Sequence, residues 1–404
     1  MTATILHSDL PEGFSFASTH CGLKRKRHDL GILVSERPAA AAAVFTTNRV
    51  TAAPVRVSRE HLRNSRGRMR AAIVNSGNAN CCTGARGEAA SRKTAVLLAR
   101  ELGALNASEV LVCSTGVIGV PLRVEKILRA IPGVVKARRQ EASAFEQFAR
   151  AIMTTDTRPK WSAARCRIGG KTIRIIGCAK GSGMIEPHMA TMLAFLATDA
   201  DISPSLLSRS LRDAVKRTFN AITVDGDSST NDTVAVFANG SSGARKIASA
   251  GADFRNFSSA LGEVCRELAL AIVADGEGAQ RVIEIEVYGA PSDEKANVVA
   301  HTIANSPLVK TAFAGGDPNW GRILAAAGRS GVVFDPDRAD IKIANIEVCS
   351  RGLERHFSER VLHAKMLAKH VPVFVHLHAG NGKARVWTCD FTSEYVRINA
   401  SYRT

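Results

Sequence analysis

The chain contains 404 residues, 45% of them hydrophobic and 23% charged, values that fit a globular protein with an ample core and exclude large-scale disorder. A formal net charge of +17 suggests nucleic-acid binding, but the basic residues are dispersed, residues 24–28 form the one dense run, and aromatic residues make up only 5%. We therefore predict a solvated basic surface and no nucleic-acid partner.

The first half of the chain predicts alternating strands and helices from residue 69 onward, after short strand-like pieces at 31–34 and 43–45. Apolar spacing predicts strands over 71–74, 109–113 and 171–176, and helices over 87–102, 123–131 and 142–153. Turn-rich NSGNAN (75–80) follows the first strand, and Ser114-Thr115-Gly116 follows the second. The GGKT at 169–172 is not a phosphate-binding loop, because Arg165 replaces the first glycine and a strand pattern follows.

The second half predicts a buried strand at 192–197 and a helix that starts at Ser203-Pro204, with serine as the cap. Further along we expect strands over 234–238 and 282–287, a helix with apolar positions from 261 to 272, a helix over 295–312, and a tail of strands and turns. Two candidate metal sites fail. The acidic segment 223–233 lacks the closing glutamate of a calcium loop, and His376 and His378 have no third ligand indicated.

The cysteines and the N-terminus bear on the cellular compartment. Nine cysteines, an odd number without a CxxC pair, are typical of a reducing environment. Residues 1–13 contain an acid and a proline where a signal peptide needs a basic start and an apolar core, and no uncharged apolar run reaches membrane-spanning length. We predict a cytoplasmic protein with no membrane partner.

The stretch KGSGMIEPHMATMLAFLATDA (180–200) carries the strongest chemical pattern. Glycines at 181 and 183 give a flexible lead-in, Pro187 stiffens the approach, and Thr191 opens the predicted strand. A hydroxyl held there could attack the Ala190 carbonyl, cut the chain, and leave Thr191 as a new N-terminus. From these residues alone, an ordinary strand that begins with threonine is the simpler interpretation, because threonine is common in strands.

Eight blocks of sequence in the same order resemble the ornithine acetyltransferase family nearly end to end. They read VFTTNRVTAAPV, VNSGNAN, STGVIG, AIMTTDT, KGSGMIEPHMATML, DGEGA, GGDPNWGRI and YVRINASYRT. The resemblance implies an α/β (α+β) layered sandwich of the self-cleaving N-terminal-nucleophile type. It also implies a cut at Ala190-Thr191 into an alpha chain (1–190) and a beta chain (191–404), which assemble into a heterotetramer.

The implied reaction moves acetyl from N2-acetylornithine to glutamate in arginine biosynthesis, by a ping-pong cycle through acetyl-Thr191. No cofactor is implied, although some members also accept acetyl-CoA as a co-substrate. Thr191 is the expected nucleophile, with the Thr115 hydroxyl and the Gly116 N–H as the oxyanion hole. The residues expected to bind substrate are Thr154, Lys180, Thr191, Glu277, Asn399 and Thr404. Lys180 suits a substrate carboxylate, and Glu277 suits the ornithine amine.

Departures from the family pattern are minor. Cys81-Cys82 stands where smaller residues are expected, and Thr404 stands where serine is frequent; both bear only on fine substrate preference. Two other classes stay open at this point. A self-processed amidase or aminopeptidase would use water as the acceptor, and a basic nucleic-acid-binding protein would show salt-dependent retention of DNA or RNA.

Overall fold

A computed structural model of the chain describes residues 5–103, 105–186 and 192–401. The strands form two sheets, one of eight strands and one of six. The first sheet has the order β4-β3-β2-β8-β7-β6-β5, with β1 paired to β2. Its strands are β1 (Phe14–Thr19), β2 (Leu30–Phe45), β3 (Arg68–Asn78), β4 (Val110–Val117), β5 (Lys160–Ile168), β6 (Lys171–Lys180), β7 (Leu193–Thr198) and β8 (Thr233–Ala238).

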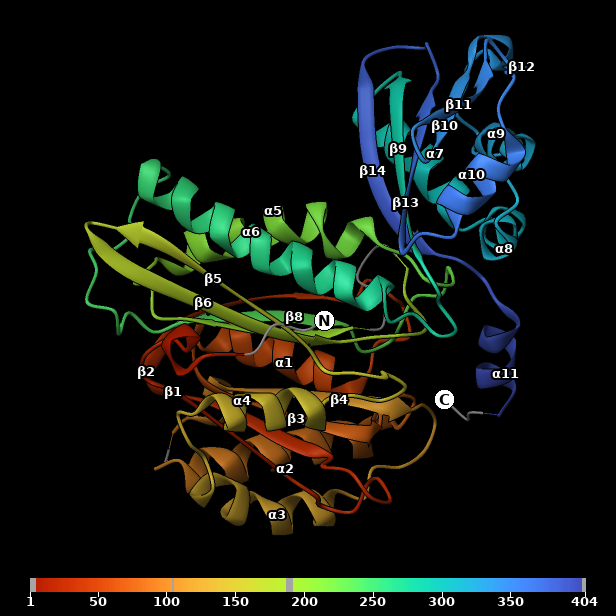
Figure 1. Ribbon diagram of the computed structural model, residues 1–404. Helices are drawn as coiled ribbons and strands as arrows, with labels where there is room; N and C mark the ends of the chain where they lie inside the picture. The colour runs from red at the N-terminus through yellow and green to blue at the C-terminus, as the bar shows by residue number, and fades with distance from the viewer. Residues whose placement is uncertain (1–4, 104, 187–191, 402–404) are drawn as a thin grey trace.

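Helices cover the first sheet on both sides, and one long strand, β2, joins its two halves. Figure 1 shows α5 (Pro204–Arg217) and α6 (Ala252–Val273) over β5, β6 and β8, and α2 (Gly84–Glu101) and α3 (Val124–Lys136) on the opposite side of the molecule. One hydrophobic core lies between the two halves. It contains side chains of β3 and β4 from one half, of β6 and β7 from the other, and of α4 (Ala142–Ala151). Helix α1 (Ala53–Asn64) packs against β4. The result is the layered α/β sandwich that the resemblance implied.

Strands in the middle of this sheet are apolar along their whole length because both faces are buried. Every residue of β7 and β8 is buried, including Thr198 and Thr233. This explains why the sequence predicted the strand at 192–197 from a continuous apolar run.

The second sheet packs one face against helices. Its order is β12-β11-β10-β13-β9-β14, and α7 (Asp293–Ala304), α8 (Pro307–Gly315), α9 (Trp320–Gly328) and α10 (Glu359–Met366) share its core. Its strands are β9 (Val282–Ala290), β10 (Asp340–Ile343), β11 (Ile346–Ser350), β12 (Leu353–Glu354), β13 (His370–His376) and β14 (Gly382–Cys389). In Figure 1 this unit stands at one end of the first, and α11 (Ser393–Ser401) extends back toward it.

Most predicted elements are confirmed with longer bounds. The pieces at 31–34 and 43–45 belong to the single strand β2, which shifts register between Val34 and Ala39. Strand β3 continues through Asn78, although NSGNAN looked like a turn. The GGKT segment forms the turn between the antiparallel strands β5 and β6. Strand β5 was not predicted.

Three predictions about helices were wrong. The helix expected over 295–312 is two helices, because Pro307 lacks the N–H that a continuous helix needs and disfavours helical geometry at Ser306 before it. The tail contains α10 and α11 as well as strands. Helix α5 begins at Pro204 as expected, but the Ser203 side chain makes no capping hydrogen bond to it.

The predicted division at Ala190-Thr191 lies outside the described residues and stays a prediction. The change from the first sheet to the second falls between β8 and β9. Within the described ranges, no helix combines the length and the apolar character needed to span a bilayer.

Candidate active site

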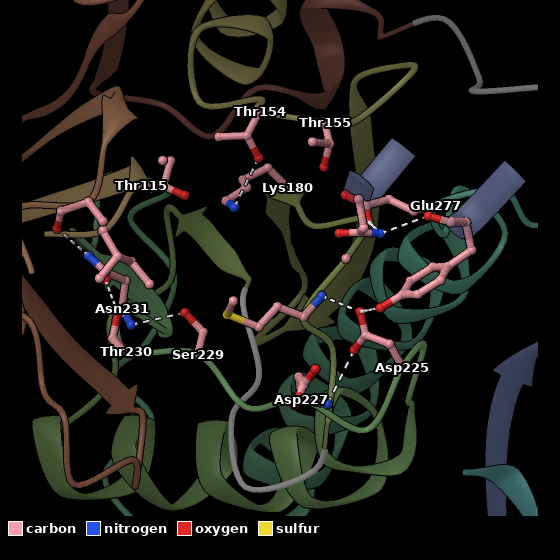
Figure 2. Close-up of a pocket in the computed structure, with 17 residues that line it drawn as sticks. Thr115, Thr154, Thr155, Lys180, Asp225, Asp227, Ser229, Thr230, Asn231 and Glu277 are labelled. Atoms are coloured by element: carbon pink, nitrogen blue, oxygen red, sulfur yellow. Dashed lines mark hydrogen bonds between the residues drawn. The ribbon is translucent and has the colours of Figure 1, made fainter. Parts of the chain in front are cut away.

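A pocket opens where strands β4 and β6 end, and the end of α6 and helix α11 complete its wall. Figure 2 shows Thr115 and Lys180 directed toward the same space. The pocket brings together six residues that the sequence analysis selected. They are Thr115, Gly116, Thr154, Lys180, Glu277 and Asn399.

The backbone around Gly116 is packed so closely that a side chain has no room. Gly116 has φ +129° and pairs with Gly77 of β3, and a Cβ built on it would overlap the Gly77 carbonyl carbon. Thr115 is 3% exposed and lines the pocket together with Gly116. Two neighbouring groups therefore face the pocket from a rigid strand end.

Asn231 fixes this strand end from the opposite side. Its Nδ2 donates to the Ser114 carbonyl at 2.8 Å and to the Ala79 carbonyl at 2.7 Å. The Ser114 hydroxyl donates to Asn75 Oδ1 at 2.6 Å. Asn231 lies in the segment that the sequence analysis took only as a turn, yet it positions the residue before Thr115.

A buried cluster of one cation and two carboxylates lies behind Lys180. Lys160 is 1% exposed, and its Nζ lies 2.5 Å from Asp156 Oδ1 and 2.6 Å from Asp275 Oδ2. Asp156 also accepts the backbone N–H groups of Thr154 and Gly181. The cluster thus ties the loop before β5, the end of β6 and the end of α6 into one unit.

The charges in this cluster shift the pKa of Asp156 and of Lys180. Burial alone would raise the pKa of Asp156, but Lys160 and Lys180 outweigh it and hold the pKa below its ordinary value. Burial lowers the pKa of Lys180, more than its acidic neighbours Asp156 and Asp232 raise it. Lys180 Nζ donates to Thr154 Oγ1 at 3.4 Å. An arriving carboxylate would stabilise this ammonium group.

Glu277 and Asn399 meet across the pocket from different parts of the chain. Asn399 Nδ2 of α11 donates to Glu277 Oε2 at 2.8 Å. The Glu277 carboxylate lies so close to Gly183 that a Cβ on that glycine would overlap it. Gly183 is therefore required for close approach, and the C-terminal helix contributes directly to the wall.

Asp225 supports the same wall. Its carboxylate accepts the N–H groups of Met184 at 2.6 Å and Ile185 at 2.9 Å, and the Tyr395 hydroxyl lies 3.4 Å away. Burial raises the pKa of Asp225 to about 6 in spite of these hydrogen bonds. The carboxylate therefore holds the segment after Gly183 to helix α11.

Asp232, the residue before β8, holds the residue that precedes β7. It is fully buried, and its Oδ1 accepts the Met192 N–H at 2.9 Å. Burial raises its pKa well above the ordinary value, although Lys180 acts in the opposite direction. The residue that follows Thr191 is thus anchored beside Lys180.

Charge is divided across the pocket in a way that suits an amino acid. Figure 2 shows Lys180 near Thr154 and Thr115, and Asp225, Asp227 and Glu277 on the other side. A substrate with one carboxylate and one ammonium group can place each against its opposite charge. Thr115 and Gly116 line the same pocket.

Thr191, Ala190 and Thr404, the remaining selected residues, lie outside the described residues. Sequence reasoning missed several supporting residues. Asp156, Lys160, Asn231 and Asp275 were not selected, and the segment that holds Asp225 and Asp232 was considered only as a calcium loop. Asp156 is part of the TTDT segment and Asp275 begins DGEG, so both signals were present. Lys160 is only four residues from Asp156, but it is 115 residues from Asp275.

The two histidines considered as metal ligands lie elsewhere. His378 Nε2 is 2.6 Å from Asp340 Oδ2, and the rings of His376 and His378 are 3.9 Å apart. The described part of the chain contains no group of three metal-ligating side chains suited to an ion.

Comparison with known proteins gives consistent matches. Residues 15–404 match the model of the ArgJ family. The "Arginine biosynthesis bifunctional protein ArgJ" of Chlorobaculum tepidum is 48% identical over 394 residues, 98% of this chain and 96% of that protein. The protein of the same name from Thermotoga neapolitana is 46% identical over 399 residues, 98% of this chain and all of its own length. A crystal structure of ArgJ from Bacillus halodurans has 44% identity and a TM-score of 0.50, covering 52% of this chain and 98% of that one.

Proposed function

This chain belongs to the ArgJ family of arginine biosynthesis, and we propose that it transfers acetyl from N2-acetylornithine to glutamate through an acetyl-Thr191 intermediate. The observation that carries the proposal is the pocket itself. Thr115, Gly116, the buried Lys180 and the carboxylates of Asp225, Asp227 and Glu277 line one pocket. Lys180 also pairs with Leu193, at the start of the strand β7 that follows Thr191 in the sequence.

Self-cleavage at Ala190-Thr191 is the first proposed step. A threonine hydroxyl is a weak nucleophile at neutral pH and needs a base. As an N-terminal residue, Thr191 would carry an α-amine with an intrinsic pKa of about 8, and that amine can accept the hydroxyl proton. Before cleavage the same nitrogen is an amide and cannot do so. Processing and activation are therefore one event.

Acetyl transfer then follows from the pocket's donors. The Thr191 oxygen attacks the acetyl carbonyl of acetylornithine, and the Thr115 hydroxyl and the Gly116 N–H stabilise the oxyanion. The amide bond breaks, ornithine leaves with the proton, and acetyl remains on Thr191 as an ester. The amine of glutamate attacks this ester in turn, which restores the free hydroxyl. Both amino acids use one site in succession.

Substrate recognition is assigned by charge. Lys180, beside Thr154, binds the α-carboxylate that the two amino acids share, and Glu277 with Asn399 receives the ornithine amine. Thr404 is also assigned to substrate binding, by resemblance to the family. No cofactor is required, because the acetyl group is carried on the enzyme. Acetyl-CoA would serve as a second donor to the same threonine.

The length of a solved relative supports the proposed cut. The Bacillus halodurans chain is covered to 98% by 52% of this chain, so it is about half as long. One product of a cut near the middle of the sequence would have that length. We propose that both products stay associated and assemble into a cytoplasmic heterotetramer.

Purified full-length protein and its Thr191→Ala variant test the proposal. The wild type should run as two chains, with Thr191 as the N-terminus of the second, and should acetylate glutamate from N2-acetylornithine. The variant should stay in one piece and make no acetylglutamate. A variant that still cleaved and still transferred acetyl would rule the mechanism out.

Two further outcomes would favour other functions. Free acetate without acetylglutamate would indicate an amidase or aminopeptidase that uses water as the acceptor. Retention of DNA or RNA at physiological salt, without acetyl transfer, would indicate the nucleic-acid-binding class.

A further inference from the structure

The connection between β1 and β2, residues 20–29, is built around one buried carboxylate. Asp29 is fully buried, and it accepts the backbone N–H groups of Cys21 at 2.5 Å, Leu23 at 2.6 Å and Lys24 at 2.8 Å. A carboxylate with several backbone donors holds its loop in a defined shape. We call residues 20–29 the basic loop.

The base of the basic loop lies against the candidate active site. Lys24 Nζ donates to the Met153 carbonyl at 2.6 Å, and Met153 precedes Thr154 of the pocket wall. A Cβ on Gly77 would lie 3.1 Å from Lys24 Cγ, and Gly77 pairs with Gly116 of the proposed oxyanion hole. Lys24 of the basic loop therefore contacts Met153 and Gly77, the direct neighbours of the pocket residues Thr154 and Gly116.

The outer part of the basic loop carries three exposed cations, Arg25, Lys26 and Arg27. Within the described ranges, no carboxylate forms an ion pair with any of them. Some exposed arginines elsewhere pair with acids, such as Arg150 with Glu146 at 2.7 Å and Arg245 with Asp253 at 2.6 Å. What sets the basic loop apart is that its three cations are consecutive in sequence and lie on a loop that Asp29 holds in shape. Unpaired cations on a loop of fixed shape form a natural binding surface for an anionic group.

We infer that the basic loop binds the phosphate groups of a nucleotide-linked acyl thioester, of the coenzyme A class, while its acetyl group reaches the pocket. The inference rests on the proposed function, because it gives the same threonine a second donor. The arm between the thioester and the diphosphate of such a molecule contains two amide units and extends about 15 Å, the length of four or five extended residues. Residues 25–27 directly follow Lys24, whose Nζ contacts the Met153 carbonyl beside the pocket wall.

The transfer step needs no further reactant. The Thr191 oxygen forms a bond to the acetyl carbon, the carbon–sulfur bond of the thioester breaks, and the hydroxyl proton ends on the released thiol. The basic loop takes no part in this bond exchange. It holds the phosphates, so its removal should weaken binding of this donor alone.

The test reverses the three charges together in R25E/K26E/R27E and compares three acetyl donors with glutamate as the acceptor. The KM for acetyl-CoA should rise about tenfold or more, since several charge-assisted contacts become repulsive. S-acetylpantetheine has the same thioester and arm but no phosphate, so its KM should not change. Transfer from N2-acetylornithine should also be unchanged, which shows that the variant folds and processes itself.

A matched control reverses three exposed cations near the second sheet, in R338E/R360E/K365E. It makes the same change in net charge, and its KM for acetyl-CoA should stay within about twofold of the wild type at moderate salt, where distant charges are screened. An equal rise in both variants would mean a general field effect and would overturn the inference.

Other outcomes separate the inference from the proposed function. If the wild type uses N2-acetylornithine but not acetyl-CoA, or if the loop variant raises the KM for S-acetylpantetheine equally, the inference fails and the proposed function stands. If N2-acetylornithine itself supports no transfer, the proposed function fails and the inference with it. Loss of RNA retention in the loop variant, with unchanged acetyl-CoA kinetics, would assign the basic loop to nucleic acid instead.

Discussion

Each of the two sheets carries a cation held between two carboxylates, and the two clusters differ in their exposure to water. Lys160 lies between Asp156 and Asp275, and all three side chains are at most 4% exposed. Arg385 lies between Glu284 and Glu286 on the second sheet, with 51% of its own side chain exposed but only 14% and 10% of theirs. The same arrangement of charge therefore occurs in a dry and in a wet setting.

The difference shows which of the two clusters fixes the position of the backbone around it. Burial makes an unpaired charge costly, so the dry cluster fixes the backbone that carries Thr154 and Gly181. Water reaches the cation of the wet cluster, so the loss of Arg385 should cost less than the loss of Lys160. The first sheet positions most of the pocket residues. Helix α11, which follows the last strand of the second sheet, contributes Tyr395 and Asn399 to the pocket wall.

The largest expected effect comes from breaking the dry cluster with Lys160→Met. Two buried carboxylates would lose their cation, which should cost about 3–5 kcal/mol of folding stability. Thermal melting and the yield of soluble protein measure it. A melting temperature within one or two degrees of the wild type would contradict the proposed role of this cluster.

Gly116→Ala tests whether the backbone of the first sheet tolerates an added side chain at this position. The new Cβ would collide with Gly77, displace the Thr115–Gly116 donors, and lower kcat for acetyl transfer by about a hundredfold or more. Gly331→Ala is the matched control from the second unit. Gly331 also has a positive φ, of +73°, but no atom lies within 4 Å of the place that its Cβ would take. Equal losses in both variants would mean that backbone strain, and not the collision, is responsible.

Asp225→Asn examines the border between the two units, where Asp225 meets Tyr395. Because the pKa of Asp225 is raised from 3.8 to about 6, the folded protein binds its proton more tightly than the unfolded chain does. The stability from this group is fully present below about pH 4 and is lost as the pH rises through about 6. The difference in melting temperature, wild type minus variant, should therefore decrease as the pH rises from about 4 to about 6. A difference independent of pH would contradict the raised pKa.

The smallest expected effect is that of Arg385→Met in the wet cluster. Its two ion pairs are partly solvated, so the loss should be below about 1 kcal/mol, and acetyl transfer should not change. The measurement is the same melting experiment as for Lys160→Met. A loss as large as that of Lys160→Met would remove the distinction between the two clusters.

Sequence reasoning performed best where one local signal decides the structure. The continuous apolar run at 192–197 predicted a strand buried on both faces, and Pro204 marked the start of α5. Local signals failed where two of them competed. The apolar spacing of 295–312 concealed the break at Pro307, and the polar NSGN of β3 looked like a turn because its hydrogen-bond partners come from β4.

The resemblance to the family predicted individual residues of the candidate site. Thr115, Lys180 and Glu277 were found in this way, and the pocket joins them. The supporting contacts were not predictable, because they connect distant positions. Asn231 reaches Ser114 and Lys160 reaches Asp275, each across more than a hundred residues, and no local pattern encodes such pairs.

The strand order has a consequence for how the enzyme can be made. β7 and β8 follow the proposed cut, yet they lie between β2 and β6, which precede it, and hydrogen bonds join them to both. Products of a cut between 187 and 191 therefore share one sheet and cannot separate without unfolding it. Two halves folded apart would each expose long unpaired strand edges. We expect that a gene split at this point yields active enzyme only when both halves are synthesised together.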